Sequence, residues 1–495
     1  EQYARRPESR YRWVGCMRGS RLVRGYCFLL GMKDKRLGVA ILAAGEGTRM
    51  RSALPKVLHP LCGRPLVEYV IELARQLGAA KTVLVAAPET VEQMRERFGD
   101  DYGYAVQAER KGTGHALMQA RPLLEGEVDQ VLVLYGADPL MRIASVAALL
   151  DQLDESNAKG AITTFIADPP AGYGRIVRDS SGHVQAIVEE RDASPEQRMI
   201  AEVNQGVVAY AAAWLWPHLD LLRPSPIKGE YYLTALVDMA VREAGPGAIV
   251  AHRLADPTEA LGVNDRWELA QAEAVMRQRI LRSLMEAGVT VTDPTHTYVD
   301  VGVTVGQDSV LLPGTMLKGA TTIGERCEIG PNSVIEDSII GNDCRVTASF
   351  LERAVMDDRS NIGPMSHLRS GAHLGPGVHV GNFGEVNRSF LGTGSKMGHF
   401  SYVGDAQVGE NVNIGAGTIT ANYDGRKKHP TTIGDGAFIG SDTIIRAPVR
   451  IGPEARTGAG AVVTKDVPDG TVVVGVPARP FRRPAASEER ESGND

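Results

Sequence analysis

The chain has 495 residues, which is more than one ordinary domain contains, so two or three domains are expected. Hydrophobic residues make up 43% and charged residues 23% of the sequence, a balance typical of folded globular proteins and not of disordered chains. The net charge of −6 argues against a nucleic-acid partner, and the lack of an apolar run of about 18 residues argues against a membrane-spanning helix.

The first 31 residues differ in composition from the rest of the chain, with seven arginines and two glutamates. They end in a short apolar run, Tyr26–Leu30, which no small-residue cleavage site follows, and this disfavours a targeting peptide. Met32 directly precedes the first predicted strand. We therefore expect residues 1–31 to be an extension that is either disordered or an artefact of the assigned start.

Residues 32–266 alternate between short apolar strands and amphipathic helices. The strands are uninterrupted hydrophobic runs, as expected for strands buried on both faces, and the helices show helical spacing of apolar residues. The predicted strands are 38–42, 82–86 and 130–134, and the predicted helices are 65–77 and 145–153. This alternation predicts an α/β fold with a parallel, doubly wound, Rossmann-like sheet.

A glycine-rich turn, Leu42–Met50, follows the first strand. Its glycines let backbone N–H groups approach phosphate oxygens, and Arg49 and Lys56 add two cations that neutralise a transferring phosphoryl group. Dinucleotide-binding folds have a third glycine where this chain has Met50, and Pro55-Lys56 follows closely. This combination resembles the sugar-1-phosphate nucleotidyltransferases, which implies catalytic roles for Arg49 and Lys56.

Further motifs resemble the UDP-N-acetylglucosamine pyrophosphorylases in the same order along the chain. Gln107-Ala108-Glu109 and Gly112–Ala116 are similar to the family's uracil-binding segment, and an amide such as that of Gln107 pairs with both the donor and the acceptor of a uracil edge. Gly172–Ile176 and Gly262–Asn264 are similar to its sugar-binding and metal-binding segments. The residues that the resemblance implies for binding UTP and UDP-N-acetylglucosamine are Leu42, Ala43, Gly45, Lys56, Gln107, Gly112, Thr113, Gly174, Glu189, Asn204 and Asn264.

The resemblance also implies a bound Mg²⁺ held by Asp138 and Asn264, which bridges the phosphates of UTP while N-acetylglucosamine-1-phosphate attacks the α-phosphorus and pyrophosphate leaves. Three positions depart from the family. Ala137 stands where the metal aspartate is usual, so that Asp138 comes one residue late. On a regular strand this shift turns the carboxylate to the opposite face, whereas the irregular backbone at a strand end allows compensation. Ala235 replaces an aspartate, and Gln205 replaces a serine or threonine.

Residues 267–287 contain neither glycine nor proline, which predicts one linking helix. From 288 to 482 the helical spacing disappears and a six-residue period begins. Aliphatic-glycine pairs open the frames 323–328, 329–334, 374–379, 408–413 and 414–419. The period predicts stacked triangular coils, with a short strand on each face, an inward aliphatic residue in each repeat and glycine at tight corners.

Three segments of the coil region interrupt the regular frames: Lys396–Asp405, Asn411–Thr418 and the loop Asn422–Lys428. They resemble the glucosamine-1-phosphate N-acetyltransferase domain, which implies a left-handed parallel β-helix. The resemblance implies that His399, oriented by Glu385, removes a proton from the 2-amino group, which then attacks the thioester of acetyl-CoA.

The same resemblance implies the remaining contacts of the acetyltransferase site. Asn387 replaces a lysine that contacts the sugar phosphate, Arg388 comes one residue later, and Gly475 stands where an arginine often contacts coenzyme A. We expect weakened binding of glucosamine-1-phosphate. The sugar-phosphate contacts implied are Arg369, Tyr402, Asn413 and Lys428, and the acetyl-CoA contacts are Ala416, Asn422, Tyr423, Ser441 and Ala459.

Taken together, the motifs predict a member of the bifunctional pyrophosphorylase and N-acetyltransferase family that makes UDP-N-acetylglucosamine for peptidoglycan and lipopolysaccharide. Two alternatives stay open: a sugar-1-phosphate nucleotidyltransferase whose β-helix is only regulatory, and a non-catalytic assembly subunit. The five scattered cysteines predict free thiols and a cytoplasmic location. Such coil domains usually form homotrimers, and residues 483–495 are expected to be a disordered tail.

Overall fold

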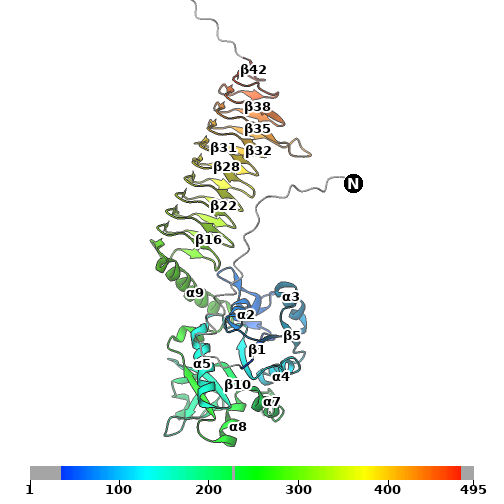
Figure 1. Cartoon of the computed structure of the whole chain (residues 1–495), viewed down its shortest axis with the longest axis vertical. Coiled ribbons are helices and arrows are strands. Elements are labelled where there is room, and N and C mark those ends of the chain that lie inside the picture. The colour runs from blue at the N-terminus through cyan, green and yellow to red at the C-terminus, as the bar shows by residue number, and fades with distance from the viewer. Residues whose placement is uncertain (1–34, 226–228, 481–495) are drawn as a thin grey trace, which may run out of the picture. The chain divides into compact units, whose positions relative to one another are not determined.

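Figure 1 shows the computed structural model of the chain, which describes residues 35–225 and 229–480. The predicted extension (1–31) and the predicted tail (483–495) lie outside these residues. The chain divides into two compact units between Val275 and Met276, unit 1 before this boundary and unit 2 after it. Among the described helices, none combines the length and the apolar character needed to cross a bilayer.

Unit 1 is built on one large sheet with the strand order β11-β7-β10-β6-β1-β4-β5, to which the hairpin β8–β9 is attached through β10. All strands of the path run in parallel except β10, which is antiparallel to both β6 and β7. The strands are β1 (Leu37–Leu42), β4 (Lys81–Ala86), β5 (Gly103–Val106), β6 (Gln130–Tyr135), β7 (Gly160–Ile166), β8 (Arg175–Arg178), β9 (Val184–Val188), β10 (Glu202–Ala211) and β11 (Ile249–Arg253), beside a small hairpin of β2 (Pro60–Leu61) and β3 (Arg64–Pro65).

The doubly wound α/β fold is confirmed, but the expectation of a wholly parallel sheet is wrong. A parallel neighbour needs a long crossover, usually a helix. Between β7 and β10 the chain makes only the β8–β9 hairpin and the four-residue helix α6 (Pro195–Arg198), so β10 returns antiparallel to β7.

Helices cover both faces of this sheet. Apolar residues of α2 and α5 form one core cluster with the sheet, and those of α4, α7 and α8 form a second cluster on the opposite face. Because both faces are covered, β1 is buried along its whole length. The helices of unit 1, apart from α6, are α2 (Leu66–Gln76), α3 (Pro88–Phe98), α4 (Thr113–Leu124), α5 (Ile143–Ser156), α7 (Ala212–Leu219) and α8 (Ala235–Ala244), with short 3₁₀ turns η1 (Thr48–Met50), η2 (Lys56–Leu58) and η3 (Pro257–Ala260).

The carboxyl ends of β1, β4 and β6 open at the same edge of the sheet. Leu42, the last residue of β1, lies beside Val85 of β4 and Tyr135 of β6. The glycine-rich turn and the segment that holds Asp138 therefore begin side by side. Open α/β sheets bind their ligands at this edge.

Unit 2 is a left-handed parallel β-helix with three faces, each a ladder of short strands (Figure 1). One helix, α9 (Arg266–Glu286), runs across the boundary between the two units and ends before the first coil. The first face comprises β12 (Thr290–Val291), β15 (Val310–Leu311), β18 (Glu328–Ile329), β21 (Arg345–Val346), β24 (Asn361–Ile362), β27 (His379–Val380), β30 (Lys396–Met397), β33 (Asn413–Ile414), β36 (Phe438–Ile439), β39 (Arg456–Thr457), β41 (Val472–Val474) and β42 (Arg479–Pro480).

The other two faces repeat this arrangement. The second face comprises β13 (Tyr298–Val299), β16 (Met316–Lys318), β19 (Val334–Glu336), β22 (Phe350–Glu352), β25 (His367–Leu368), β28 (Gly384–Asn387), β31 (Ser401–Gly404), β34 (Ile419–Ala421), β37 (Ile444–Arg446) and β40 (Val462–Val463). The third face comprises β14 (Thr304–Val305), β17 (Thr322–Ile323), β20 (Ile339–Ile340), β23 (Val355–Met356), β26 (His373–Leu374), β29 (Phe390–Leu391), β32 (Ala406–Val408), β35 (Thr431–Ile433) and β38 (Val449–Ile451).

A ladder of aliphatic side chains fills the interior of the β-helix. On the second face one fully buried residue from each coil stacks on the next, in the order Leu317, Ile335, Leu351, Leu368, Val386 and Val403. The corners need glycine where coils approach closely. A Cβ atom at Gly381 would lie 1.9 Å from the carbonyl oxygen of Gly398, so no larger residue fits there.

Candidate active sites

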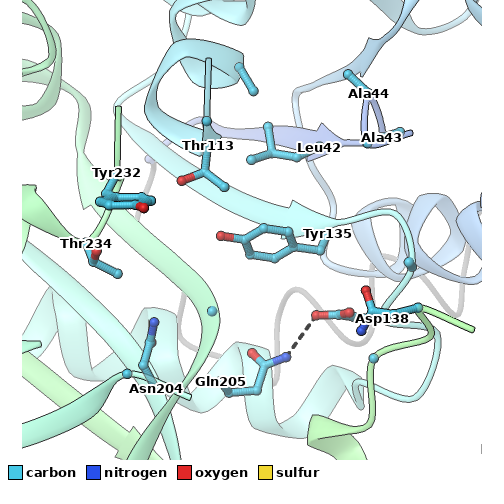
Figure 2. Close-up of a pocket in the computed structure, with 18 of the residues that line it drawn as sticks. Leu42, Ala43, Ala44, Thr113, Tyr135, Asp138, Asn204, Gln205, Tyr232 and Thr234 are labelled. Atoms are coloured by element: carbon cyan, nitrogen blue, oxygen red, sulfur yellow. Dashed lines mark hydrogen bonds between the residues drawn. The ribbon is translucent and has the colours of Figure 1, made fainter. Parts of the chain in front are cut away.

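A cavity of about 550 Å³ lies at the carboxyl edge of the sheet in unit 1 (Figure 2). It is lined by every residue predicted to bind the uridine nucleotide, although these residues come from segments spread over more than two hundred positions. The cavity-lining residues among the predictions are Leu42, Ala43, Gly45, Lys56, Gln107, Gly112, Thr113, Gly174, Glu189, Asn204 and Asn264, together with Asp138.

Arg49 lies in an adjoining depression and not in the main cavity. The glycine-rich turn, Lys56, Arg110 and Asn264 also line this depression, so the two predicted catalytic cations share it. Gly47 has a φ of +63°, and a Cβ atom there would lie 2.6 Å from Cβ of Lys56, so the turn packs directly on the lysine stem. Burial lowers the pKa of Lys56, and the nearby Arg49 lowers it further.

Gln107 is buried just after β5 and its side-chain nitrogen is already engaged. Nε2 donates to the carbonyl oxygen of Gly112 (3.1 Å) and lies 3.1 Å from Nδ1 of His115. No described residue donates a hydrogen bond to its side-chain oxygen. This geometry leaves an amide acceptor for a ligand N–H, which is the group that uracil presents beside its carbonyl oxygens.

The opposite wall of the cavity carries polar groups suited to a sugar. Figure 2 shows Asn204 on this wall together with Tyr232 and Thr234. Oδ1 of Asn204 is buried without a hydrogen-bond partner, and the hydroxyl of Thr234 donates to Glu189 (3.2 Å). A buried unpartnered acceptor costs free energy unless a ligand satisfies it. Ala235, where the family has an aspartate, begins α8.

Asp138 lies in the cavity despite its shifted position in the sequence. Strand β6 ends at Tyr135, and the backbone N–H of Asp138 donates to the carbonyl oxygen of Tyr135 (3.1 Å) in a turn. The alternation of side chains therefore stops before residue 138, and both Ala137 and Asp138 line the cavity. The irregular backbone at the end of β6 thus compensates for the one-residue shift and leaves the Asp138 carboxylate in the cavity.

The donor chemistry beside Asp138 fits a hard divalent cation. Asp138 offers a carboxylate and Asn264 an amide oxygen, which accepts a hydrogen bond from Nζ of Lys56 (3.1 Å). Burial raises the pKa of Asp138 to about 7, against the opposing effects of Lys56 and Gln205. In the part of the chain that the structure describes, no three His, Cys, Asp or Glu residues gather as a metal cluster. Mg²⁺ is commonly held by one or two such ligands plus phosphate oxygens and waters.

In unit 2, four predicted residues lie at the same corner of four consecutive coils. Each of them comes two residues after the last residue of the first-face strand in its coil. The strands are β30, β33, β36 and β39, and the residues that follow them are His399, Ala416, Ser441 and Ala459. Backbone hydrogen bonds join the coils here, from Gly417 N to Phe400 O (2.7 Å) and from Gly460 N to Ser441 O (2.8 Å). We call these four residues the corner column. Its histidine side chain is exposed.

The predicted sugar-phosphate contacts lie near the second face. Tyr402 is in β31, Arg369 directly follows β25, and Arg369 donates to the carboxylate of Glu385 (3.0 Å). In the described part of the chain no hydrogen bond joins Glu385 to His399, and the orientation of the histidine by this carboxylate stays a prediction. Asn413 lies in β33 on the first face, one corner away.

Two residues occupy the region where the family has a lysine that contacts the sugar phosphate. Asn387 is buried at the end of β28. Arg388 forms a two-pronged ion pair with Asp405 (2.7 and 2.9 Å), which also accepts a hydrogen bond from Asn422. Arg388 is therefore committed to Asp405 and does not replace the lysine.

The loop after β34 leaves the coil. Asp424 holds it together by accepting hydrogen bonds from two backbone N–H groups of the loop (2.8 Å each) and by pairing with His429 (2.7 Å). Tyr423 and Lys428 are exposed on this loop and form an antiparallel bridge. Asn422, in contrast, is buried at its base.

Sequence reasoning missed two polar residues of unit 1. Arg110 lines both the cavity and the phosphate depression, and its guanidinium contacts the carbonyl oxygen of Ala44 (2.9 Å) and the carboxylate of Glu46 (3.0 Å). Its position directly after the uracil-binding segment was the available signal. For Gln205 the sequence shows only a departure from the family's serine or threonine, yet its side-chain amide donates a hydrogen bond to Asp138 (3.0 Å).

Comparison with known proteins supplies family matches for both units. A nucleotidyl transferase family model matches residues 39–214, and the six-repeat bacterial transferase hexapeptide model matches residues 302–337 and 430–465. A curated relative named bifunctional protein GlmU, from Heliobacterium modesticaldum, is 47% identical over 440 residues, which is 89% of this chain and 95% of the relative. Proteins of the same name from Trichlorobacter lovleyi (47% over 438 residues, 88% of this chain and 94% of the relative) and a Geobacillus species (45% over 440 residues, 89% and 95%) are also similar.

Proposed function

This chain belongs to the GlmU family of bifunctional proteins, and from that premise we propose that it is an enzyme that makes UDP-N-acetylglucosamine in two reactions. Unit 2 transfers the acetyl group of acetyl-CoA to glucosamine-1-phosphate. Unit 1 then transfers the uridylyl group of UTP to N-acetylglucosamine-1-phosphate and releases pyrophosphate. The product serves peptidoglycan and lipopolysaccharide synthesis.

The observation that carries the first activity is the convergence of twelve predicted side chains and backbone segments on one cavity at the carboxyl edge of the sheet: eleven nucleotide contacts and Asp138. We propose that Gln107 binds uracil, that the glycine-rich turn binds the triphosphate, and that Asn204 and Glu189 bind the sugar. Arg49 and Lys56 neutralise the charge that develops on the transferring phosphoryl group. No protein nucleophile is required, because in-line attack needs only positioning and charge neutralisation.

We propose Asp138 and Asn264 as the residues that hold Mg²⁺. When bound, the ion neutralises phosphate charge and orients the phosphates for attack. The nearby amino group of Lys56 keeps the oxygen of Asn264 in place through its hydrogen bond. Removal of the Asp138 carboxylate is therefore expected to weaken metal binding and uridylyl transfer together.

For the second activity we propose His399 as the general base and the rest of the corner column as the contact surface for acetyl-CoA. An exposed histidine suits removal of a proton from the sugar amine, because a ring nitrogen of neutral imidazole accepts a proton. Arg369, Tyr402, Asn413 and Lys428 supply the sugar-phosphate contacts in this proposal. Asn422 and Tyr423 complete the acetyl-CoA site.

We also propose that the protein is a cytoplasmic homotrimer. The three described cysteines, Cys62, Cys327 and Cys344, form no disulfide, which supports a reducing compartment. Within one chain Glu385 is engaged by Arg369 and the corner column is open, which supports completion of the acetyltransferase site by a second copy. Size measurement by light scattering tests the trimer.

Two assays on the same preparation test the proposed function. Pyrophosphate release from UTP and N-acetylglucosamine-1-phosphate reports unit 1, and free thiol release from acetyl-CoA and glucosamine-1-phosphate reports unit 2. A chain active only in the first assay would be a nucleotidyltransferase with a regulatory β-helix, and a chain inactive in both would be a non-catalytic subunit. Asp138→Ala is expected to lose the first activity and keep the second, and full pyrophosphate release by this variant would exclude Asp138 as a metal ligand.

A further inference from the structure

We propose that Gln205 is a positioning residue that fixes the Asp138 carboxylate for cation binding, so that the two departures from the family pattern act as a pair. This inference rests on the uridylyl-transfer function proposed above and deepens it. It assigns a role to a side chain that the family pattern does not provide, since a serine or threonine is usual at this position.

A bulge in β10 brings Gln205 into the cavity. On a regular strand Asn204 and Gln205 would point to opposite faces. The pairing of β10 with β7 shifts register between Asn204 and Val208, and Gly206 has a φ of +118° in this interval. Both Asn204 and Gln205 consequently line the cavity. Bulges commonly redirect a side chain beside an active site in this way.

Hydrogen bonds determine which end of the Gln205 amide faces Asp138. The backbone N–H of Val207 donates to Oε1 of Gln205 (2.9 Å), and the hydroxyl of Thr163 lies 2.8 Å from the same oxygen. A backbone N–H is always a donor, so the side-chain oxygen must face it. Nε2 therefore points away from β10 and donates to Oδ2 of Asp138 at 3.0 Å, the bond drawn as a dashed line in Figure 2.

The other oxygen of Asp138 lies against the backbone of Gly262. A Cβ atom at Gly262 would lie 2.7 Å from Oδ1, so a larger residue there would displace the carboxylate. The carboxylate is thus held between the Gln205 amide and the Gly262 backbone. Among the described residues, Gln205 is the one that donates a hydrogen bond to it.

This arrangement matters because Asp138 lies beyond the end of β6, where hydrogen bonds between strands no longer hold the backbone in place. A neutral amide donor orients the carboxylate without adding a positive charge that would compete with a cation. Loss of such an outer hydrogen bond typically costs 10–100-fold in metal affinity or activity. A serine is too short to span the same gap from the bulge.

The test compares Gln205→Ser with Gln130→Ser in the full chain. Gln130 is the control, because it lies at the start of β6 and its side chain likewise donates a hydrogen bond to an aspartate, Asp154 (2.7 Å), that does not line the cavity. The readouts are the Kd of Mn²⁺ for the UTP-loaded protein, from the electron paramagnetic resonance signal of unbound Mn²⁺, and kcat and KM for pyrophosphate release. Circular dichroism and thermal melting of each variant report the folding of unit 1.

We expect Gln205→Ser to raise the Kd of Mn²⁺ by about 10–100-fold and to lower kcat/KM similarly, while Gln130→Ser stays within about threefold of the parent. In an Asp138→Ala background the Gln205→Ser change should have almost no further effect, since the partner is gone. The near-isosteric Gln205→Met keeps the approximate size of the side chain but has no N–H donor for Asp138, and serves if Gln205→Ser misfolds. It should weaken Mn²⁺ binding at least as much.

The inference is overturned if Gln205→Ser and Gln205→Met both leave the Kd of Mn²⁺ within about threefold of the parent. An equal loss in the presence and absence of the Asp138 carboxylate also overturns it, because Gln205 would then act on the fold and not on Asp138. If the parent releases no pyrophosphate, the proposed function fails separately, and the Mn²⁺ comparison still decides whether Gln205 positions Asp138.

Discussion

Replacement of Gly112 by alanine tests whether the close contact of Gly112 with the Tyr231 backbone holds the wall of the unit 1 cavity in position. Gly112 adopts φ 93° and ψ 179°, a region that is almost exclusive to glycine. A Cβ atom there would lie 2.7 Å from the carbonyl oxygen of Tyr231, whereas ordinary contact begins at 3.4 Å. The Tyr231 backbone must therefore move by about 0.7 Å. That backbone is joined to the start of α4 through hydrogen bonds with Lys111 (2.7 Å) and Gly114 (2.8 Å).

Gly99 supplies a matched control in the same unit. Its backbone has nearly the same conformation, φ 79° and ψ −171°, but a Cβ atom there would meet nothing within 4 Å. Backbone strain of about 1–3 kcal/mol is expected in both alanine variants. For a domain of this size, each should lower the melting temperature by roughly 2–12 °C.

Only the Gly112→Ala variant should also lose uridylyl transfer. The segment that must move contributes Tyr232 and Thr234 to the cavity wall. A misplacement of cavity-lining side chains that approaches 1 Å can cost up to about 100-fold in rate. Steady-state pyrophosphate release, with scanning calorimetry on the same samples, measures both effects. If Gly112→Ala keeps a kcat/KM within about threefold of Gly99→Ala, the contact with Tyr231 does not set the cavity and the reasoning is refuted.

Three further outcomes are expected. Chelation by EDTA should abolish pyrophosphate release and spare thiol release, because only unit 1 is proposed to use Mg²⁺; equal inhibition of both assays would contradict this. His399→Ala should lower thiol release by roughly 100-fold or more through loss of the general base, with pyrophosphate release unchanged; a similar loss in both assays would point to misfolding. Asn387→Lys should lower the KM for glucosamine-1-phosphate by about tenfold, because Arg388 is held by Asp405 and supplies no free cation; an unchanged KM measured by thiol release would count against it.

Local sequence patterns were sufficient to predict the features that depend on short-range physics. The six-residue period of unit 2 follows from one inward aliphatic residue in each repeat, and Ile329 and Leu374, which open two of the predicted frames, are fully buried. The glycine-rich turn was likewise visible, because Gly47 and Lys56 are close in sequence as well as in space.

Features that depend on distant contacts could not be predicted in the same way. The antiparallel direction of β10 depends on a hairpin connection whose strands look ordinary in sequence. The position of Asp138 depends on where β6 ends. The contact of Gln205 depends on the bulge in β10, which turns its side chain toward Asp138, a residue 67 positions away in the sequence. Strand periodicity alone could not decide which face Asp138 occupies, because it carries no information about where the strand stops.

The corner column sets a length scale for any molecule that lies along it. Neighbouring parallel strands are about 4.8 Å apart, so the three steps from His399 to Ala459 span roughly 14 Å. In the proposed acetyltransferase site, the number of coils, and not the reach of individual side chains, therefore sets the length of thioester donor that the column can contact. A donor with a truncated arm should react at the histidine end but lose the contacts at Ser441 and Ala459. Its binding should weaken in proportion to the coils it no longer reaches.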